Sequence, residues 1–401
     1  MSPLFESARH EPLAEEPWDE SAARDAIRAI AAEAEAAMSP DGTWPWHPLD
    51  LEGEPEPPHR SLYVGSAGTL WALWSLRESG FATLAGSPEA VAAGLHAAYL
   101  AQPDLGKAVP SYFLGEAGLL LVAFRLTGSR EAAERLAAVI AANHRNPTLE
   151  ALWGAPGTLV AATHMHAWTG EPRWEALKRE SADALWEAWL PSPTRPCRLW
   201  TQDLYGRVRP LLGSGHGFAG NVHALLRALP QRDASRRDEL VARCEETLRV
   251  TAMHDGGLVN WPPSADPKAD EKMLVQWCHG APGMVTGLDG IHPGTSPGID
   301  ALLVAGGELT WRSGPLAKGP GLCHGTAGNG YAFLKLHRRT GERRWLDRAR
   351  AFAMHALGQW KASRARYGQG RHSLWTGDTG VAIYLRDCIT ATADWPTLDA
   401  L

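Results

Sequence analysis

The sequence has no run of about eighteen apolar residues, and its N-terminus has no basic start followed by an apolar segment, so neither a membrane-spanning helix nor a secretory signal is indicated. Basic residues are not in excess either, because 39 Lys and Arg face 45 Asp and Glu and the net charge is -6. Such a chain has no broad attraction for nucleic acid or for an anionic membrane. We therefore expect a cytoplasmic protein that binds neither nucleic acid nor membranes.

Linkers and disulfide frameworks are missing as well. No charged or low-complexity stretch is long enough to divide the 401 residues, which favours one domain over residues 1–401, and nothing demands a second subunit, so we expect a monomer. The five cysteines are an odd number without short framework spacing, which predicts reduced thiols. Tryptophan, in contrast, is over-used, with 18 Trp beside 7 Tyr and 7 Phe, and we expect most of these tryptophans in a helical core.

Seven Gly-x-x-Gly pairs divide the chain into repeats of about fifty residues. In a chain with 41 glycines about four such pairs would occur by chance, so the surroundings of the pairs carry the argument. Each pair is followed by a segment that is apolar nearly all round and preceded by an amphipathic, charged segment, which indicates a buried helix after a surface helix. The pairs are Gly65/Gly68, Gly115/Gly118, Gly154/Gly157, Gly217/Gly220, Gly280/Gly283, Gly325/Gly328 and Gly377/Gly380.

A helical hairpin of this size cannot bury its own apolar face, so neighbouring repeats must stack. Seven hairpins can close on themselves and form an all-α double barrel, with an inner ring of seven buried helices inside an outer ring of seven amphipathic ones. Closure would bring the glycine turns to one mouth, where glycine allows a sharp turn and leaves room for a ligand at the axis. The alternative is an open solenoid, which would not gather residues of the fourth, fifth and sixth repeats at one point.

Four segments rich in Pro and Gly lie outside the repeat pattern and read as long irregular loops. The last three of them precede the turns that hold the candidate functional residues, and long loops near such residues are more often functional than decorative. These segments are Leu49–Arg60, Leu190–Leu212, Trp261–Lys272 and Arg312–Pro320.

Three turns carry the residue types of a metal site: SGHGFAGN with His216, WCHGAPGM with Cys278 and His279, and GLCHGTAGN with Cys323 and His324. Two thiolates and an imidazole suit zinc, because soft sulfur selects zinc over magnesium or calcium, and three protein ligands leave one position open. We therefore predict one Zn²⁺ ion held by Cys278, Cys323 and His324. The wide spacing of the two cysteines matches no zinc finger, and the alternative is a pair of buried free thiols.

The open position favours chemistry on an incoming thiol. Two protein thiolates neutralise the charge of the ion, so a further thiolate stays electron-rich and nucleophilic. His216 then suits a general acid or base near neutral pH, and the alternative is a hydrogen-bonded structural histidine. The role of the neighbouring His279 stays open between these two interpretations.

The chain resembles the LanC-like family, relatives of the lanthionine cyclases. It shares with them seven Gly-x-x-Gly helical repeats and the motifs GHGFAG, WCHGAPG and GLCHGTAGN in the family's order. The resemblance covers essentially the whole chain. It implies an α/α toroid, zinc on the three ligands above and His216 as acid or base. It also implies a site carboxylate at Glu150, four residues before Gly154.

Two positions depart from the peptide-cyclising branch of the family, which usually has Tyr after the first zinc cysteine and Arg four residues before it. Here His279 and Leu274 stand there, and His in that turn is similar to the stand-alone glutathione-binding branch. In that branch Lys318 and Arg366 correspond to basic residues that would meet the carboxylates of glutathione. The alternative for both is a solvated surface charge.

The resemblance implies an enzyme that adds a thiol, with glutathione as the expected co-substrate, to dehydroalanine or dehydrobutyrine residues in a peptide or protein. The same site would also suit elimination of phosphate from phosphoserine or phosphothreonine, so the expected partner is a dehydrated or phosphorylated peptide or protein. Two alternatives remain: a lanthipeptide cyclase that forms intramolecular thioether rings, and a glutathione-binding module without turnover.

Overall fold

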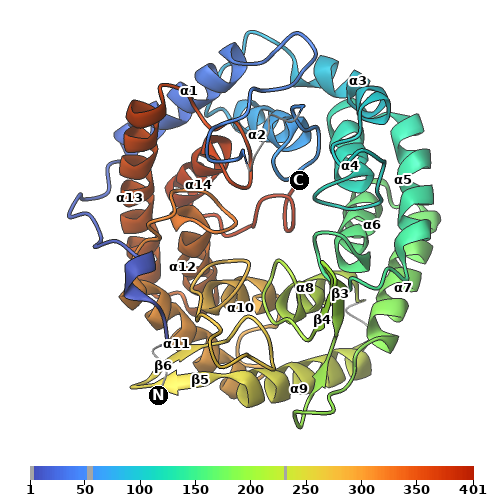
Figure 1. The fold of residues 1–401 in the computed structure, drawn as a ribbon, viewed down its shortest axis with the longest axis vertical. Coiled ribbons are helices and arrows are strands. Elements are labelled where there is room, and N and C mark those ends of the chain that lie inside the picture. The colour runs from blue at the N-terminus through green and yellow to red at the C-terminus, as the bar shows by residue number, and fades with distance from the viewer. Residues whose placement is uncertain (1–3, 52–56, 230–232) are drawn as a thin grey trace.

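The computed structural model describes residues 4–51, 57–229 and 233–401. Fourteen α-helices in these residues alternate between an outer and an inner ring (Figure 1). The outer helices are α1 (Glu20–Ala36), α3 (Pro88–Ala101), α5 (Arg130–Asn143), α7 (Pro172–Glu187), α9 (Ala234–Thr251), α11 (Pro297–Ser313) and α13 (Arg343–Tyr367). The inner helices are α2 (Ser66–Glu78), α4 (Glu116–Thr127), α6 (Ala155–Thr169), α8 (Phe218–Ala228), α10 (Ala281–Leu288), α12 (Thr326–Thr340) and α14 (Asp378–Thr390).

The ring closes where the first and last repeats meet. Helix α1 packs against α14, and α14 packs against α2, although these helices come from opposite ends of the chain. The predicted α/α toroid, with seven helices in each ring, is therefore confirmed, and the open solenoid is excluded.

The two rings differ in how their helices are stabilised. In the inner helix α12 every residue from Thr326 to Leu336 is buried, so this helix depends on packing on all sides. Outer helices bury one face, and five of the seven begin at a residue, such as Ser87, Ser129 or Ser296, whose side chain accepts a backbone N–H bond. A cap of this kind contributes about 1 kcal/mol. No described helix is both long and apolar enough to cross a membrane.

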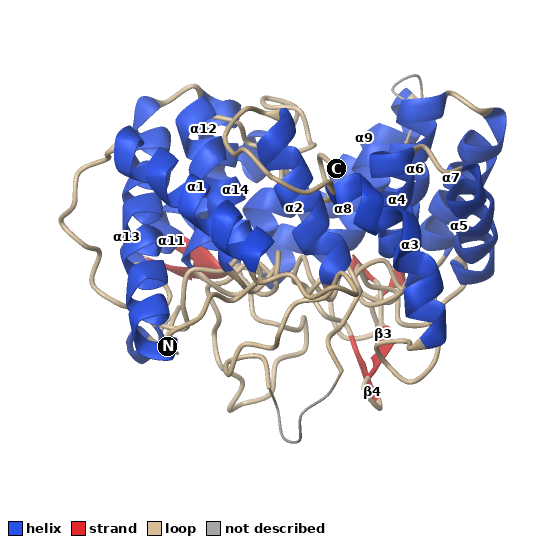
Figure 2. Cartoon of the chain, turned by 90° about the horizontal axis from the view of Figure 1, so that it is seen from above, coloured by secondary structure: helices blue, strands red, loops and turns tan. Residues whose placement is uncertain are grey.

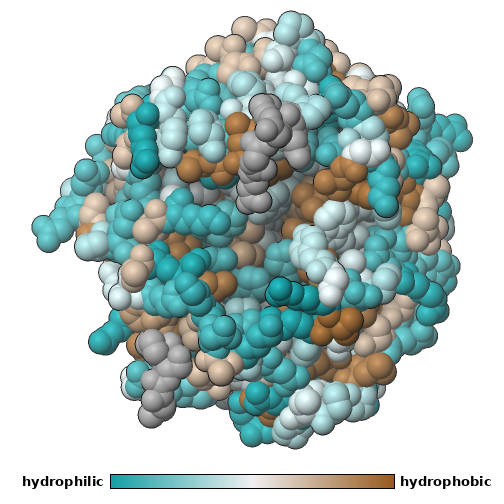
Figure 3. All heavy atoms as spheres, viewed as in Figure 1, coloured by the Kyte–Doolittle hydropathy of each residue, from teal (hydrophilic) through white to brown (hydrophobic). Residues whose placement is uncertain are grey.

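The glycine turns all lie on one face of the ring. Each inner helix has the first glycine of a pair as its N-cap residue, so all seven inner helices start on the face where the loops gather (Figure 2). We call this side the turn face. It is the face that Figures 1 and 3 present to the viewer.

Two loops of the turn face are more regular than the sequence suggested. Leu190–Leu212, expected to be irregular, contains two antiparallel hairpins, and a third hairpin precedes Trp261. In the hairpin of residues 202–209, Tyr205 and Gly206 both adopt positive φ, as a type I′ turn requires, and Gly256 and Gly257 do the same in the third hairpin. Residues 52–56 of the loop Leu49–Arg60 lie outside the described residues. The strands are β1 (Leu190–Pro191), β2 (Arg198–Leu199), β3 (Gln202–Leu204), β4 (Arg207–Arg209), β5 (Met253–Asp255) and β6 (Leu258–Asn260).

The glycine pairs make room for backbone rather than for a ligand, which corrects the sequence-based interpretation. A Cβ on Gly328 would lie 1.7 Å from the carbonyl oxygen of Leu322, and one on Gly118 would lie 2.0 Å from that of Tyr112. The second glycine of every pair meets a carbonyl oxygen of its own turn in the same way. Glycine is needed there because the helix start presses against the loop that precedes it.

Candidate metal centre

The seven turns place equivalent residues at equivalent points around the axis. The position two residues before the first glycine is linked from turn to turn by backbone hydrogen bonds. The N–H of Cys278 donates to the carbonyl oxygen of Cys323 (3.3 Å), the N–H of Cys323 to that of Trp375 (2.9 Å), and the N–H of Trp375 to that of Tyr63 (3.2 Å). Cysteines at this position in the fifth and sixth turns therefore lie side by side, although they are far apart in the sequence.

The predicted ligands come together at this point. The sulfur atoms of Cys278 and Cys323 and a ring nitrogen of His324 all lie within 4.8 Å of one another. Both cysteines are buried and His324 is half-buried. Two sulfurs and an imidazole this close together fit the soft donor set that zinc prefers, with Cys278, Cys323 and His324 as the residues that would hold it.

Two further side chains contact the thiols. The Gln276 amide donates a hydrogen bond to the sulfur of Cys278 (3.0 Å). A hydrogen bond with Cys323 lowers the pKa of the Cys278 thiol, and the same interaction raises that of Cys323. Burial raises the pKa of Tyr63 well above its ordinary value, and the charge of Cys323 and a hydrogen bond to it raise this pKa further. Neither Gln276 nor Tyr63 was identified from the sequence.

His216 and His279 occupy the position directly before the first glycine in the fourth and fifth turns, as His324 does in the sixth. Their rings stack with centroids 5.4 Å apart. The Nδ1 atom of His216 lies 3.1 Å from Glu150, which is fully buried. Burial opposes a charged His216 imidazole, but the hydrogen bond and the charge of Glu150 outweigh it and raise the pKa of His216.

His279 has the opposite electrostatic environment. Burial lowers its pKa to about 4, so its imidazole is neutral near pH 7. Its Nδ1 atom has no hydrogen-bond partner among the residues that the structure describes. The two adjacent histidines therefore have pKa values shifted in opposite directions.

A family model described as "Lanthionine synthetase C-like protein" matches residues 56–400 and so includes all of these turns. The chain belongs to this family.

Three members or structural neighbours illustrate the relationship. The LanC-like chain is 31% identical over 210 residues to glutathione S-transferase LANCL1 of Danio rerio, which covers 50% of this chain and 47% of that protein. It is 37% identical over 149 residues to LanC-like protein GCL1 of Arabidopsis thaliana, covering 36% and 32%. The matches thus span about half or less of these relatives. The structure of nisin cyclase matches with a TM-score of 0.60 and 13% identity over 92% of this chain and 94% of that one, which shows a shared fold.

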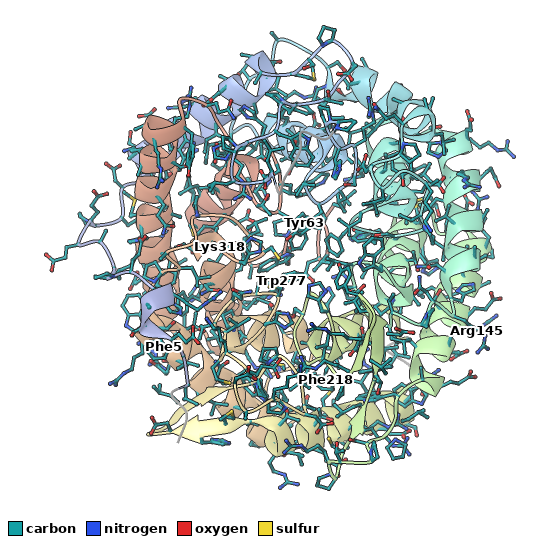
Figure 4. All side chains as sticks on the ribbon, viewed as in Figure 1. Phe5, Tyr63, Arg145, Phe218, Trp277 and Lys318 are labelled. Atoms are coloured by element: carbon teal, nitrogen blue, oxygen red, sulfur yellow. The ribbon has the colours of Figure 1, made fainter. Side chains whose placement is uncertain are left out.

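The two basic residues singled out in this LanC-like chain face one cleft of the turn face. Lys318 and Arg366 line a cleft of about 280 Å³ with Gln359, Thr376 and Asp378. Arg366 belongs to the last turn of α13. Neither cation has a carboxylate partner within the described ranges, whereas Arg371 in the same cleft is paired with Asp50. Lys318 lies near the axis, as do Tyr63 and Trp277 (Figure 4).

The turn face also collects exposed apolar side chains. Large hydrophobic residues that are exposed in the described chain lie on loops, hairpins or an outer-helix end of this face, and hydrophobic patches are visible among hydrophilic ones in Figure 3. Single exposed apolar side chains are common on protein surfaces, so only their shared location distinguishes these residues. They are Leu49, Leu51, Leu100, Leu105, Leu190, Tyr205 and Val208.

Proposed function

We propose that this LanC-like protein joins a thiol, with glutathione as the first candidate, to the double bond of a dehydroalanine or dehydrobutyrine residue in a peptide or protein. The observation that carries the proposal is the donor set of Cys278, Cys323 and His324 beside the histidine pair of the neighbouring turns. The family and the name of the LANCL1 relative support a thiol as co-substrate.

Zinc on these ligands would lower the pKa of an incoming thiol and keep its sulfur nucleophilic. The cleft with Lys318 and Arg366 would supply two cations, neither with a carboxylate partner among the described residues, for the carboxylates of glutathione. The exposed apolar side chains of the turn face would contact the peptide that carries the dehydro residue. All three features lie on one face of the ring.

The proton steps follow from the two histidines. Neutral His279 accepts the proton that leaves the thiol, and protonated His216 donates a proton at the α-carbon after the sulfur has bonded to the β-carbon. One proton leaves and one is delivered, so the addition balances. Glu150 orients His216 by holding its Nδ1 atom, which leaves Nε2 to face the substrate.

A mass measurement tests the reaction. Zinc-loaded protein is incubated with glutathione and a dehydroalanine peptide, and we expect the peptide to gain the mass of glutathione. The gain should disappear with a chelator and in His216→Ala. An unchanged peptide mass in the presence of bound glutathione would leave a binding module without turnover and would refute the proposal.

The same assay distinguishes the cyclase alternative by a different change in the peptide. A peptide that carries both a dehydroalanine and a cysteine would keep its mass and lose its free thiol if the protein closes a thioether ring. We expect glutathione addition to exceed ring closure. A phosphoserine peptide, tested in parallel, shows whether phosphate elimination precedes addition.

The role of the cleft is tested with two thiols. Lys318→Met and Arg366→Met should each raise the KM for glutathione about threefold to tenfold, as expected for a partly exposed charge contact. The KM for cysteamine, which has no carboxylate, should not change. Lys107→Met, at an exposed lysine of another loop on the turn face, is the matched control. Equal effects on both thiols would contradict glutathione recognition by these residues.

A further inference from the structure

The segment from Ala391 to Leu401 runs back into the ring from the end of α14 and lies behind the turns (Figure 1). Three contacts with inner-ring residues hold it there. The Tyr112 hydroxyl donates to the carbonyl oxygen of Thr397, and Arg125 donates to that of Leu401 (3.0 Å). Arg227 donates to the backbone carbonyl oxygen of Asp399 (3.0 Å). Within this segment, residues 395–398 are buried.

The side chain of Asp399 anchors the segment further. Its carboxylate lies 2.5 Å from the ammonium of Lys335, a lysine that is 1% exposed inside the ring. The same carboxylate accepts the backbone N–H of Trp395 (2.8 Å). Because a buried charge is costly unless paired, this ion pair fixes where the Trp395 backbone sits.

Trp395 contacts the turn that carries Cys278 and the seventh turn, which is hydrogen-bonded to Cys323. Its ring stacks on Trp277, with centroids 5.0 Å apart and planes at 18°, and Trp277 is the residue before Cys278. It also packs against Trp375 at 5.9 Å. The carbonyl oxygen of Trp375 accepts the N–H of Cys323 (2.9 Å). One buried ring thus contacts the Cys278 turn directly and the backbone of Cys323 through Trp375.

We infer that Trp395 is a positioning residue, which holds Cys278 and Cys323 at the separation that a shared metal ion requires. Zinc–sulfur bonds have a narrow preferred length of about 2.3 Å, so a small relative shift of two turns from different repeats weakens binding. The inference rests on the metal site of the proposed function but not on the reaction. Residues that orient metal ligands typically contribute about 10-fold to 100-fold to metal affinity.

The test measures zinc dissociation constants of Trp395→Phe and Trp395→Leu. We expect the constant to rise a fewfold for Phe, which can still stack, and about tenfold or more for Leu, which cannot. In the cobalt-substituted protein, the thiolate-to-cobalt absorption should weaken in the same order. Trp174 in α7 supplies the matched controls Trp174→Phe and Trp174→Leu, because it is equally buried and its indole N–H, like that of Trp395, lacks an acceptor in the described chain.

A metal-free measurement separates this inference from the proposed function. Phenylarsine oxide bridges two neighbouring thiols, so it should bind tightly to the metal-free parent protein and more weakly to the Trp395 variants. Parent protein that binds the arsenical but no zinc would overturn the proposed function, and the arsenical affinities alone would then decide whether Trp395 positions the two thiols. Parental zinc and arsenical affinities in the Trp395 variants, or equal losses in the Trp174 controls, would overturn the inference. If Trp395→Leu does not fold, Trp395→Phe against Trp174→Phe decides by the same criteria.

Discussion

The backbone N–H of Cys278 donates a hydrogen bond to the carbonyl oxygen of Cys323, 3.3 Å away. This bond belongs to a series that links equivalent positions of successive turns, so the two thiols meet because their repeats are neighbours in a closed ring. The proposed metal site is therefore a property of the ring and not of any one loop.

Replacing one of these thiols should remove the metal and spare the fold. In Cys323→Ala only Cys278 and His324 remain as ligands, too few for a stable zinc site, so zinc content should fall from about one per chain to near zero. The helical circular dichroism should persist, because the lost atom is small. Metal analysis of the purified variant provides the measurement.

Cys244→Ala is the control for that loss. Cys244 is a buried thiol of α9, in the outer ring, and burial raises its pKa, as expected for an inert structural cysteine. This variant should keep its zinc. Full zinc content in Cys323→Ala would contradict the assignment of Cys323 as a ligand.

The sequence predicts the ring and the meeting of the proposed ligands well, for a physical reason. The same helical hairpin pattern occurs in each repeat, so seven independent occurrences support the prediction. Equivalent positions of successive repeats then converge when the ring closes. Comparing positions relative to the glycine pairs could also have identified Gln276 and Tyr63. Gln276 stands four residues before its glycine, as Glu150 does, and Tyr63 is the counterpart of Cys323 in the first turn.

The C-terminal segment could not be found in this way, because it lies outside the repeat. Its place depends on partners far away in the sequence, such as Lys335 for Asp399. One signal was available: Lys335 interrupts the apolar segment YAFLKL, and a lysine inside a buried helix requires an acidic partner. The sequence does not say which of the acidic residues supplies it.

The glycine turns give a prediction about stability. In Gly328→Ala the new Cβ would lie 1.7 Å from the carbonyl oxygen of Leu322, so we expect a loss of about 3 kcal/mol or more in the free energy of unfolding. A Cβ added at Gly358, inside α13, would meet no atom beyond its own helix backbone within 4 Å, and Gly358→Ala should raise stability by about 0.5–1 kcal/mol. Urea unfolding of both variants checks the contrast. Similar effects of the two changes would show that close approach does not explain the glycines.

A buried ion pair of the inner ring gives a prediction about acid stability. Burial raises the pKa of Glu116, but hydrogen bonds from His96 and Arg135 outweigh it and lower the pKa to about 2, below the ordinary 4.5. The carboxylate therefore stabilises the fold above pH 4.5, and this contribution is lost as the pH falls towards 2. Glu116→Gln should lower the free energy of unfolding by about 1–2 kcal/mol at pH 7 and by much less near pH 2.5. A difference that stays constant with pH would refute this explanation.

The contact between His216 and Glu150 gives a prediction about the pH dependence of the proposed reaction. If protonated His216 delivers the proton, activity falls when the pH rises above its pKa, and the Glu150 carboxylate extends activity to higher pH by raising that pKa. Glu150→Gln removes the charge, so the alkaline limb of kcat/KM should move to lower pH by about one unit. Glu175→Gln, which changes the partner of the distant His166 at 3.2 Å, should leave the limb in place. A limb that does not move in Glu150→Gln would mean that His216 is not the proton donor, since no other change in that variant compensates for the lost carboxylate.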